Sequence, residues 1–310
     1  MTAARRGIGP VAAMVVATLL WGATFVIARD ALARIRPTAL VGLRFAAAAV
    51  VLGAVAAVRR ARGDGPARGL DRETLIGGVA TGALTAGGYL FQAIGLTSTA
   101  AGTSAFLTCA GTLAAGLFAW PLLGERPNRT LAAGLAMAAA GSALLSLRGG
   151  FTLGRGELWT LLGAVTYALQ IVAVARWMRR ADRAPDPVLL TALQAATVAA
   201  CLLPFAGPLV GLIGGIGPAD ALRLAYLVLA GSVMAPLLQV LAQRTLPAAR
   251  IGLLFALEPV FALVFAIAFG GERFVARWWL GAALIVAAVV RVEWRAARAA
   301  TTPPATSGSA

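Results

Sequence analysis

The chain has 310 residues, of which 60% are hydrophobic and only 13% are charged, and its formal net charge is +15. A soluble protein carries about 25% charged residues because its surface must be solvated, so most of this chain must lie in lipid. The apolar composition excludes intrinsic disorder, and a chain with only two cysteines cannot form a disulfide scaffold. The sequence has no histidine, which is the usual general base and the commonest metal ligand. We therefore expect no metal and no cofactor.

Apolar runs of membrane-spanning length occur along the whole chain. A helix needs about 20 mostly apolar residues to cross the hydrocarbon core, and a helix satisfies its backbone groups within one segment. These runs predict an all-α polytopic membrane protein with ten transmembrane helices, over residues 11–28, 38–58, 74–96, 100–123, 131–147, 158–175, 188–206, 221–243, 249–270 and 278–292.

Some segments allow more than one interpretation. The first span resembles a signal peptide, but its apolar run exceeds the about 7–15 residues of a signal core and nine spans follow, so we expect an uncleaved helix. Pro204 and Pro236 predict bends in the seventh and eighth spans. The apolar stretch 205–217 predicts either a longer seventh span or a re-entrant turn, and residues 299–310 predict a disordered tail.

Basic residues fall in short clusters between the spans. If the N-terminus is cytoplasmic, 18 of the 27 Arg residues lie in cytoplasmic segments and 8 in the opposite segments. Cytoplasmic loops retain positive charge, so we expect both termini in the cytoplasm and the chain in a cell membrane of the bacterial inner-membrane type. Nucleic-acid binding is not expected, because it needs basic residues together on one water-exposed face.

The two halves of the chain match at an offset of 147 residues. Gly124-Glu125-Arg126 recurs as Gly271-Glu272-Arg273, and the intramembrane Gln92 recurs as Gln239. Each half holds five spans, and an odd number makes the second half enter the membrane from the opposite side. Two inverted repeats around a central cavity predict a transporter that works by alternating access. A duplication kept only for stability is the alternative.

Short motifs follow one another in a fixed order, namely Leu20-Trp21-Gly22-Ala23-Thr24-Phe25, Leu43-Arg44-Phe45, Gln92-Ala93-Ile94-Gly95-Leu96, Gly124-Glu125-Arg126, Leu257-Glu258-Pro259-Val260-Phe261 and Gly271-Glu272-Arg273. With them the chain resembles the EamA-type members of the drug/metabolite transporter superfamily, as two EamA-like units over residues 11–147 and 156–292. The resemblance implies ten helices, a central substrate cavity and export of amino acids or other small metabolites. Gly111-Thr112 stands where the family often has a proline in the fourth span.

Polar side chains at membrane depth are costly, so each is a candidate substrate contact, with interhelical packing as the alternative. Gln92 and Gln239 occupy equivalent positions, and an amide offers two donors and an acceptor to a polar ligand. Tyr89 lies one turn before Gln92, and Gln243 lies one turn after Gln239, on the same helix faces. We predict that these four side chains line the cavity.

Two aromatic residues lie in the middle of spans, whereas interfacial aromatic residues belong at span ends. Trp21 in the first span and Tyr167 in the sixth are predicted to wall the cavity and to stack on an apolar or aromatic ligand. Thr24, Phe25 and Gln170 follow about one turn further along and complete the predicted substrate-binding set. Core packing is the alternative for each.

Arg44 and Glu258 are charged residues within spans. Arg44 is expected to snorkel to the interface or to pair with Asp30, and pairing with a substrate carboxylate is the alternative. Burial favours the neutral form of a carboxyl group, which makes Glu258 a candidate for proton coupling. The alternative is a structural hydrogen bond to the Phe255 carbonyl, which Pro259 leaves without its N–H partner.

These features predict an exporter of small metabolites, with amino acids as the expected substrates, aromatic or hydrophobic ones included. The alternative is a nucleotide-sugar or phosphate-ester carrier. Arg44 alone would make a poor phosphate-binding site, because phosphate favours several basic side chains. A membrane enzyme is disfavoured by the lack of His and of paired intramembrane carboxylates, and a channel by the lack of a charged ring. The expected partners are a small-molecule substrate and the lipid bilayer, and two repeats in one chain allow a functional monomer.

Overall fold

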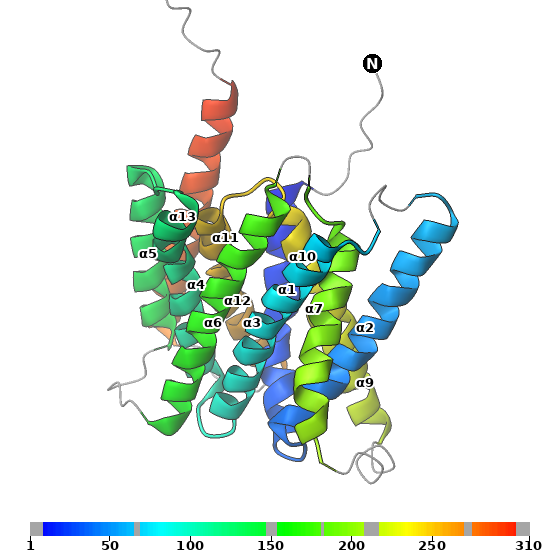
Figure 1. The fold of residues 1–310 in the computed structure, drawn as a ribbon. Helices are drawn as coiled ribbons and strands as arrows, with labels where there is room; N and C mark the ends of the chain where they lie inside the picture. Colours follow the sequence, from blue (N-terminus) through cyan, green and yellow to red (C-terminus); the bar gives the residue numbers. More distant parts are fainter. Residues whose placement is uncertain are drawn as a thin grey trace, which may run out of the picture.

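A computed structural model describes residues 9–64, 69–146, 154–180, 183–207, 217–269 and 275–301. Within these ranges the chain is helical, with short connections and no β-strand, and the helices form one bundle (Figure 1). The all-α prediction is therefore confirmed for the described part of the chain. The second Gly-Glu-Arg turn at 271–273 and residues 302–310 of the predicted tail lie outside the described residues.

Each predicted span overlaps one helix or a run of consecutive helices. The elements are α1 (Pro10–Leu32), α2 (Pro37–Ala61), α3 (Arg72–Leu96), α4 (Ala101–Leu123), α5 (Arg129–Ser146), α6 (Arg155–Met178), α7 (Pro187–Leu202), the 3₁₀ turn η1 (Leu203–Phe205), α9 (Pro218–Val228), the π-helical turn η2 (Leu229–Met234), α10 (Ala235–Ala242), α11 (Ala248–Phe255), α12 (Leu257–Phe269) and α13 (Ala276–Thr301).

Eight helical segments of the described chain are long and apolar enough to cross a membrane, as expected of a multi-pass membrane protein. Two further helices differ from these eight. The apolar part of α5 is shorter, over Arg129–Leu145, and α13 carries Arg291, Arg295 and Arg298 in its last turns. These two helices pack against each other at one side of the bundle (Figure 1).

Both predicted proline bends coincide with a change of helix type. Proline has no N–H, and its ring clashes with the carbonyl four residues earlier. At Pro204 the α-helix ends and one 3₁₀ turn follows, whereas Pro236 is preceded by the π-helical turn η2. Residues 208–216, which include most of the predicted re-entrant stretch, lie outside the described residues.

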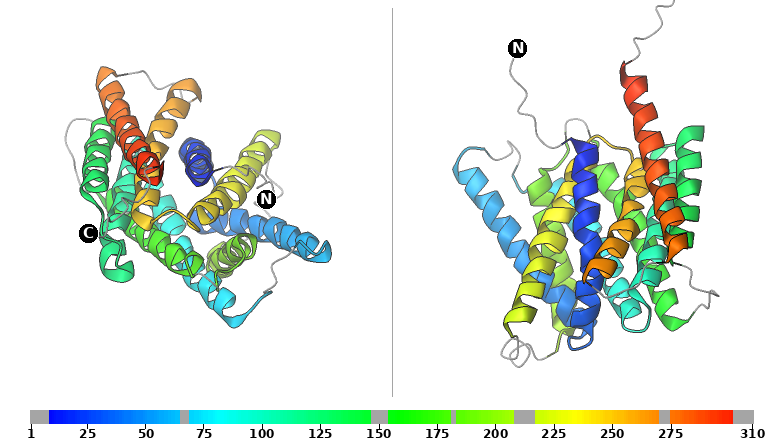
Figure 2. Two further views of the ribbon diagram at one scale, coloured as in Figure 1. Left: turned by 90° about the horizontal axis from the view of Figure 1, so that it is seen from above. Right: turned by 180° about the vertical axis from the view of Figure 1, so that it is seen from behind.

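Helices from the two halves of the chain interleave. Seen from above, α1 stands between α12 and the α9–α10 run (Figure 2). Further contacts join α6 to α3 and α4, α7 to α2 and α3, and α4 to α11. Glycines allow close approach, since a Cβ at Gly82 of α3 would lie 2.6 Å from Cβ of Thr197 in α7. This interleaving brings side chains from both halves to the middle of the bundle.

Candidate functional site

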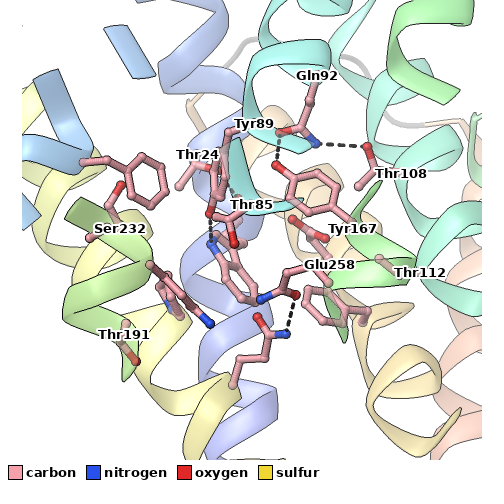
Figure 3. Close-up of a pocket in the computed structure, with 18 residues that line it drawn as sticks. Thr24, Thr85, Tyr89, Gln92, Thr108, Thr112, Tyr167, Thr191, Ser232 and Glu258 are labelled. Carbon is pink, nitrogen blue, oxygen red and sulfur yellow. Dashed lines mark hydrogen bonds between the residues drawn. The ribbon is translucent and has the colours of Figure 1, made fainter. Parts of the chain in front are cut away.

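A cavity lies in the middle of the bundle, between helices of both halves (Figure 3). Hydroxyl, amide and aromatic side chains dominate its lining, and among the residues that the structure describes α5 and α13 contribute none of it. The lining residues are Trp21, Thr24, Phe45, Thr85, Tyr89, Gln92, Thr108, Thr112, Tyr167, Gln170, Thr191, Gln194, Ala195, Ser232, Pro236, Gln239, Phe255 and Glu258.

Most of the predicted substrate-contact residues lie in this lining, namely Trp21, Thr24, Tyr89, Gln92, Tyr167, Gln170, Gln239 and Glu258. Phe25 does not, because it points to another face of α1, where it packs with Leu96, Ala105 and Ala262. Gln243 is fully buried next to Gln239 and is also absent from the lining. The structure therefore brings together residues from both predicted clusters, the amides and the aromatic rings.

Trp21, Tyr89 and the Gly231 carbonyl form a hydrogen-bonded cluster in one wall. The Trp21 indole N–H donates to the Tyr89 hydroxyl at 2.9 Å and to the Gly231 carbonyl oxygen at 3.1 Å. The Tyr89 hydroxyl donates to the same carbonyl at 3.2 Å. The Trp21 ring also stacks on Phe255, with centroids 5.1 Å apart. These contacts hold the two rings in fixed orientations at the cavity surface.

The backbone of η2 explains why Gly231 accepts these bonds. In an α-helix its carbonyl would accept from the Ala235 N–H, but here that N–H donates to Ala230. A π-type bond would need an N–H at Pro236, which proline lacks. The Gly231 carbonyl is thus left without a partner in its own helix, and buried carbonyls need one. Side chains of α1 and α3 supply the donors.

Gln92 joins three helices at another part of the wall. Its Nε2 donates to the Thr108 hydroxyl at 3.0 Å, and the Tyr167 hydroxyl donates to its Oε1 at 3.4 Å (Figure 3). The Tyr167 ring in turn packs edge-on against Tyr89, with centroids 5.5 Å apart. The amide is therefore held by side chains of α4 and α6.

Gln239 is held by an amide network. Its Nε2 donates to Oε1 of Gln170 at 3.0 Å and to Oε1 of Gln243 at 2.9 Å, and Gln243 donates to the Ile171 carbonyl at 2.7 Å. Gln243 thus holds the Gln239 side chain in place from the side that faces away from the cavity. Within the described chain, Oε1 of Gln239 and Nε2 of Gln170 make no hydrogen bond. One acceptor and one donor are therefore free at the cavity.

Arg44 neither snorkels to the interface nor pairs with Asp30, so those two expectations are wrong. Its side chain is 4% exposed, and Nε donates to the Ser232 hydroxyl at 2.7 Å. Asp30 pairs instead with Arg223 at 3.1 Å. The physical reason is that the face of α2 that carries Arg44 points toward η2 and α3, so the side chain extends into the bundle.

Glu258 is the one acidic residue in the described lining, and it is 6% exposed. In the described residues no hydrogen bond joins its carboxyl group to the Phe255 carbonyl. The helix is interrupted instead, since α11 ends at Phe255 and α12 begins at Leu257. This break accommodates Pro259 and leaves the Glu258 side chain at the cavity (Figure 3).

Several small hydroxyl residues line the cavity that the sequence patterns did not predict to be there. Thr85 and Ser232 are two of these, and they are related by the same offset of 147 residues that relates Gln92 to Gln239. Repeat equivalence is therefore a signal that identifies them. The other unselected polar lining residues are Thr108, Thr112, Thr191 and Gln194.

The sequence profile of the EamA-like transporter family matches the chain twice, over residues 9–147 and 154–293. The chain belongs to the EamA-like transporter family. This family lies within the drug/metabolite transporter superfamily, as the resemblance predicted. The EamA-like transporter is 25% identical over 277 residues to an uncharacterized transporter of Archaeoglobus fulgidus, which covers 89% of this chain and 83% of that protein. A crystal structure shares its fold with a TM-score of 0.70 at 23% identity, over 94% of this chain and 98% of that one.

The cavity of this EamA-like transporter offers amide and hydroxyl groups, aromatic ring faces and one carboxyl group. Among the described residues no three His, Cys, Asp or Glu side chains come together as metal ligands would. A small ligand with a polar end and an apolar or aromatic part fits such a lining, because polar groups fix its orientation and rings contact the rest.

Proposed function

We propose that this EamA-like transporter exports amino acids by alternating access between two inverted five-helix repeats, residues 11–147 and 156–292, that share the central cavity. The observation that carries the proposal is that residues 147 positions apart line the same cavity. Inverted repeats commonly place the substrate site at their interface near the bilayer midplane. The equivalent pairs are Thr85 with Ser232, Tyr89 with Pro236, Gln92 with Gln239, and Thr108 with Phe255.

The packing partners of the helices support the same proposal. Each helix has a counterpart five spans away in the other half of the chain. When every helix is replaced by its counterpart, the contact of α3 with α6 corresponds to the contact of α10 with α1. The α4–α6 contact becomes that of α12 with α1, and the pairs α2–α7, α4–α11 and α5–α13 map onto themselves. When the same helix contacts occur in both halves, the two halves can exchange conformations. Alternating access requires two such related arrangements of the bundle.

The directions of the helices support inverted repeats with ten spans. In Figure 1, α1 begins at the side of the bundle where α6 ends, so the first helices of the two halves run in opposite directions. The start of α1 and the end of α13 lie at the same side. The excess of Arg in the connections of that side favours a cytoplasmic location for both termini in a cell membrane. Two repeats in one chain allow the protein to function as a monomer.

The lining favours amino acids among small metabolites. The unbonded Nε2 of Gln170 and Oε1 of Gln239 suit the polar end of an amino acid. The rings of Trp21 and Tyr167 suit an apolar or aromatic side chain. A phosphate ester would favour several basic groups at the cavity surface. Glu258, a buried titratable carboxyl group at the cavity, is the proposed site where export is coupled to proton movement.

Efflux from proteoliposomes tests the proposal. The purified protein is reconstituted into vesicles loaded with labelled amino acids, and the rate of loss is compared with that of protein-free vesicles. We expect at least one amino acid, with aromatic and hydrophobic ones tested first, to leave faster. The matched control is the Gln92→Ala/Gln239→Ala double variant, which should lose the excess rate. If every amino acid leaves at the protein-free rate, the proposed function is wrong.

A further inference from the structure

Arg44 carries a buried guanidinium that has no carboxylate partner in the described part of the chain. Its side chain is 4% exposed, and its Nε donates to the Ser232 hydroxyl at 2.7 Å. Its Nη2 is buried and has no hydrogen-bond partner among the residues that the structure describes. The ion pairs of the described chain use other arginines, so no acidic side chain there neutralises Arg44.

Such a group is costly to keep in a membrane protein. A buried charge without a counter-ion loses its favourable hydration, and intramembrane arginines are rare and functional for this reason. The aromatic faces offset part of the cost, since the guanidinium carbon lies 5.1 Å from the Tyr89 ring centroid and 5.6 Å from that of Phe45. The unpartnered Nη2 remains, and it is a donor that prefers an anionic oxygen.

The surroundings of Arg44 belong to the cavity. Ser232, Tyr89 and Phe45, which contact its guanidinium, all line the cavity. The lack of a Cβ at Gly231 lets the guanidinium pack closely against η2, because a Cβ there would lie 2.7 Å from Nη2. Arg44 itself is absent from the lining, but its neighbours are part of it, and side-chain rotamer changes of the kind that are common on binding would bring the guanidinium to the cavity.

We infer that Arg44 binds the carboxylate of the transported substrate, with Ser232 orienting the guanidinium. This inference rests on the proposed function and specifies its substrate class as small molecules with a free carboxylate. A single guanidinium matches one carboxylate, and a phosphate dianion would bring more negative charge than one arginine neutralises. Figure 3 shows Ser232 and Glu258 on opposite sides of the cavity, so an amino acid held at Arg44 extends toward the acid.

Binding to the purified wild-type protein tests the inference without a mutation. Thermal unfolding in detergent is followed with an amino acid, its carboxamide, the matching monocarboxylate without the amino group, and a phosphate monoester of similar size. We expect the two carboxylates to raise the unfolding midpoint, at concentrations at least about tenfold lower than the carboxamide requires. Equal effects of acid and amide, an effect of the phosphate ester alone, or no effect of any carboxylate would overturn the inference.

The variants Arg44→Gln and Arg44→Lys then test whether Arg44 causes the preference for the carboxylate. Arg44→Gln should abolish the preference for the acid over the amide, whereas Arg44→Lys should retain part of it, because lysine keeps the charge but lacks the planar fork. Thr97→Ala, an exposed change at the end of α3, is the control that should retain the full preference. An acid preference that survives in folded Arg44→Gln contradicts the inference. Transport failure without loss of carboxylate binding would instead contradict the proposed export function.

Discussion

The Glu125 carboxylate accepts a hydrogen bond from the backbone N–H of Ala248 at 2.9 Å. Ala248 is the first residue of α11, and its N-cap residue Pro247 provides no side-chain cap. Glu125 therefore caps this helix from the turn after α4, and it also forms an ion pair with Arg179 at the end of α6. One carboxylate thus ties together three helices on one side of the bundle.

Glu125→Ala should lower the free energy of unfolding by about 1–2 kcal/mol, because it removes a charged helix cap. Arg179 is 42% exposed, so Arg179→Ala should lower the free energy of unfolding by less than about 1 kcal/mol. Denaturant unfolding of the two variants in detergent measures both effects. A Glu125→Ala variant as stable as wild type would show that the cap contributes nothing.

Gln92→Ala and Gln239→Ala should each slow export about fivefold, since each removes a hydrogen-bonding group from the cavity wall and one such bond contributes about 1 kcal/mol. Initial efflux rates from proteoliposomes measure the loss, and the elution profile of each purified variant checks its folding. Thr97→Ala, which lies away from the lining, should keep the wild-type rate. Wild-type rates in both glutamine variants would remove these residues from the site.

Glu258→Gln should make export independent of a pH gradient, because the amide neither binds nor releases a proton. The wild-type rate is expected to rise when the proton gradient is directed opposite to substrate efflux. Glu258→Asp is the matched control, since it keeps a titratable carboxyl group at the cavity and should keep the dependence. A pH dependence that persists in Glu258→Gln would exclude this residue as the coupling site.

Gly231→Ala should destabilise the protein by about 1–3 kcal/mol, because the new Cβ would lie 2.7 Å from Nη2 of Arg44 and 2.9 Å from Cγ2 of Thr24. Gly53→Ala is the matched control, since a Cβ there meets nothing within 4 Å and alanine favours a helix by about 1 kcal/mol. Thermal unfolding midpoints compare the two variants. Equal midpoints for both would contradict the close approach at Gly231.

The positions of the helices were largely predictable, because membrane thickness sets the length of an apolar run. Residues 74–96 were predicted and α3 covers Arg72–Leu96. The end of α13 was missed, since Arg295 and Arg298 end the apolar run while the helix continues to Thr301. Hydropathy reports contact with lipid, whereas Ala and Arg favour a helix in water as well.

The cavity was only partly predictable. Repeat equivalence selected Gln92 and Gln239, whose long amides are rare in lipid. Thr85 was missed because a threonine in a helix also bonds to its own backbone, as its hydroxyl does to Thr81. The direction of Arg44 and the free carbonyl of Gly231 depend on the packing of η2 against α1 and α2, which no local pattern encodes.

The relative orientation of the two halves is the most direct test of the inverted repeat. Ser98 and Thr245 are exposed turn residues 147 positions apart, after α3 and after α10. Single cysteines at these positions, in a chain with Cys109 and Cys201 replaced, are labelled with a membrane-impermeant thiol reagent in intact cells and in inverted vesicles. The inverted repeat predicts that Ser98→Cys reacts from outside and Thr245→Cys from the cytoplasmic side. Reaction of both from the same side would contradict it.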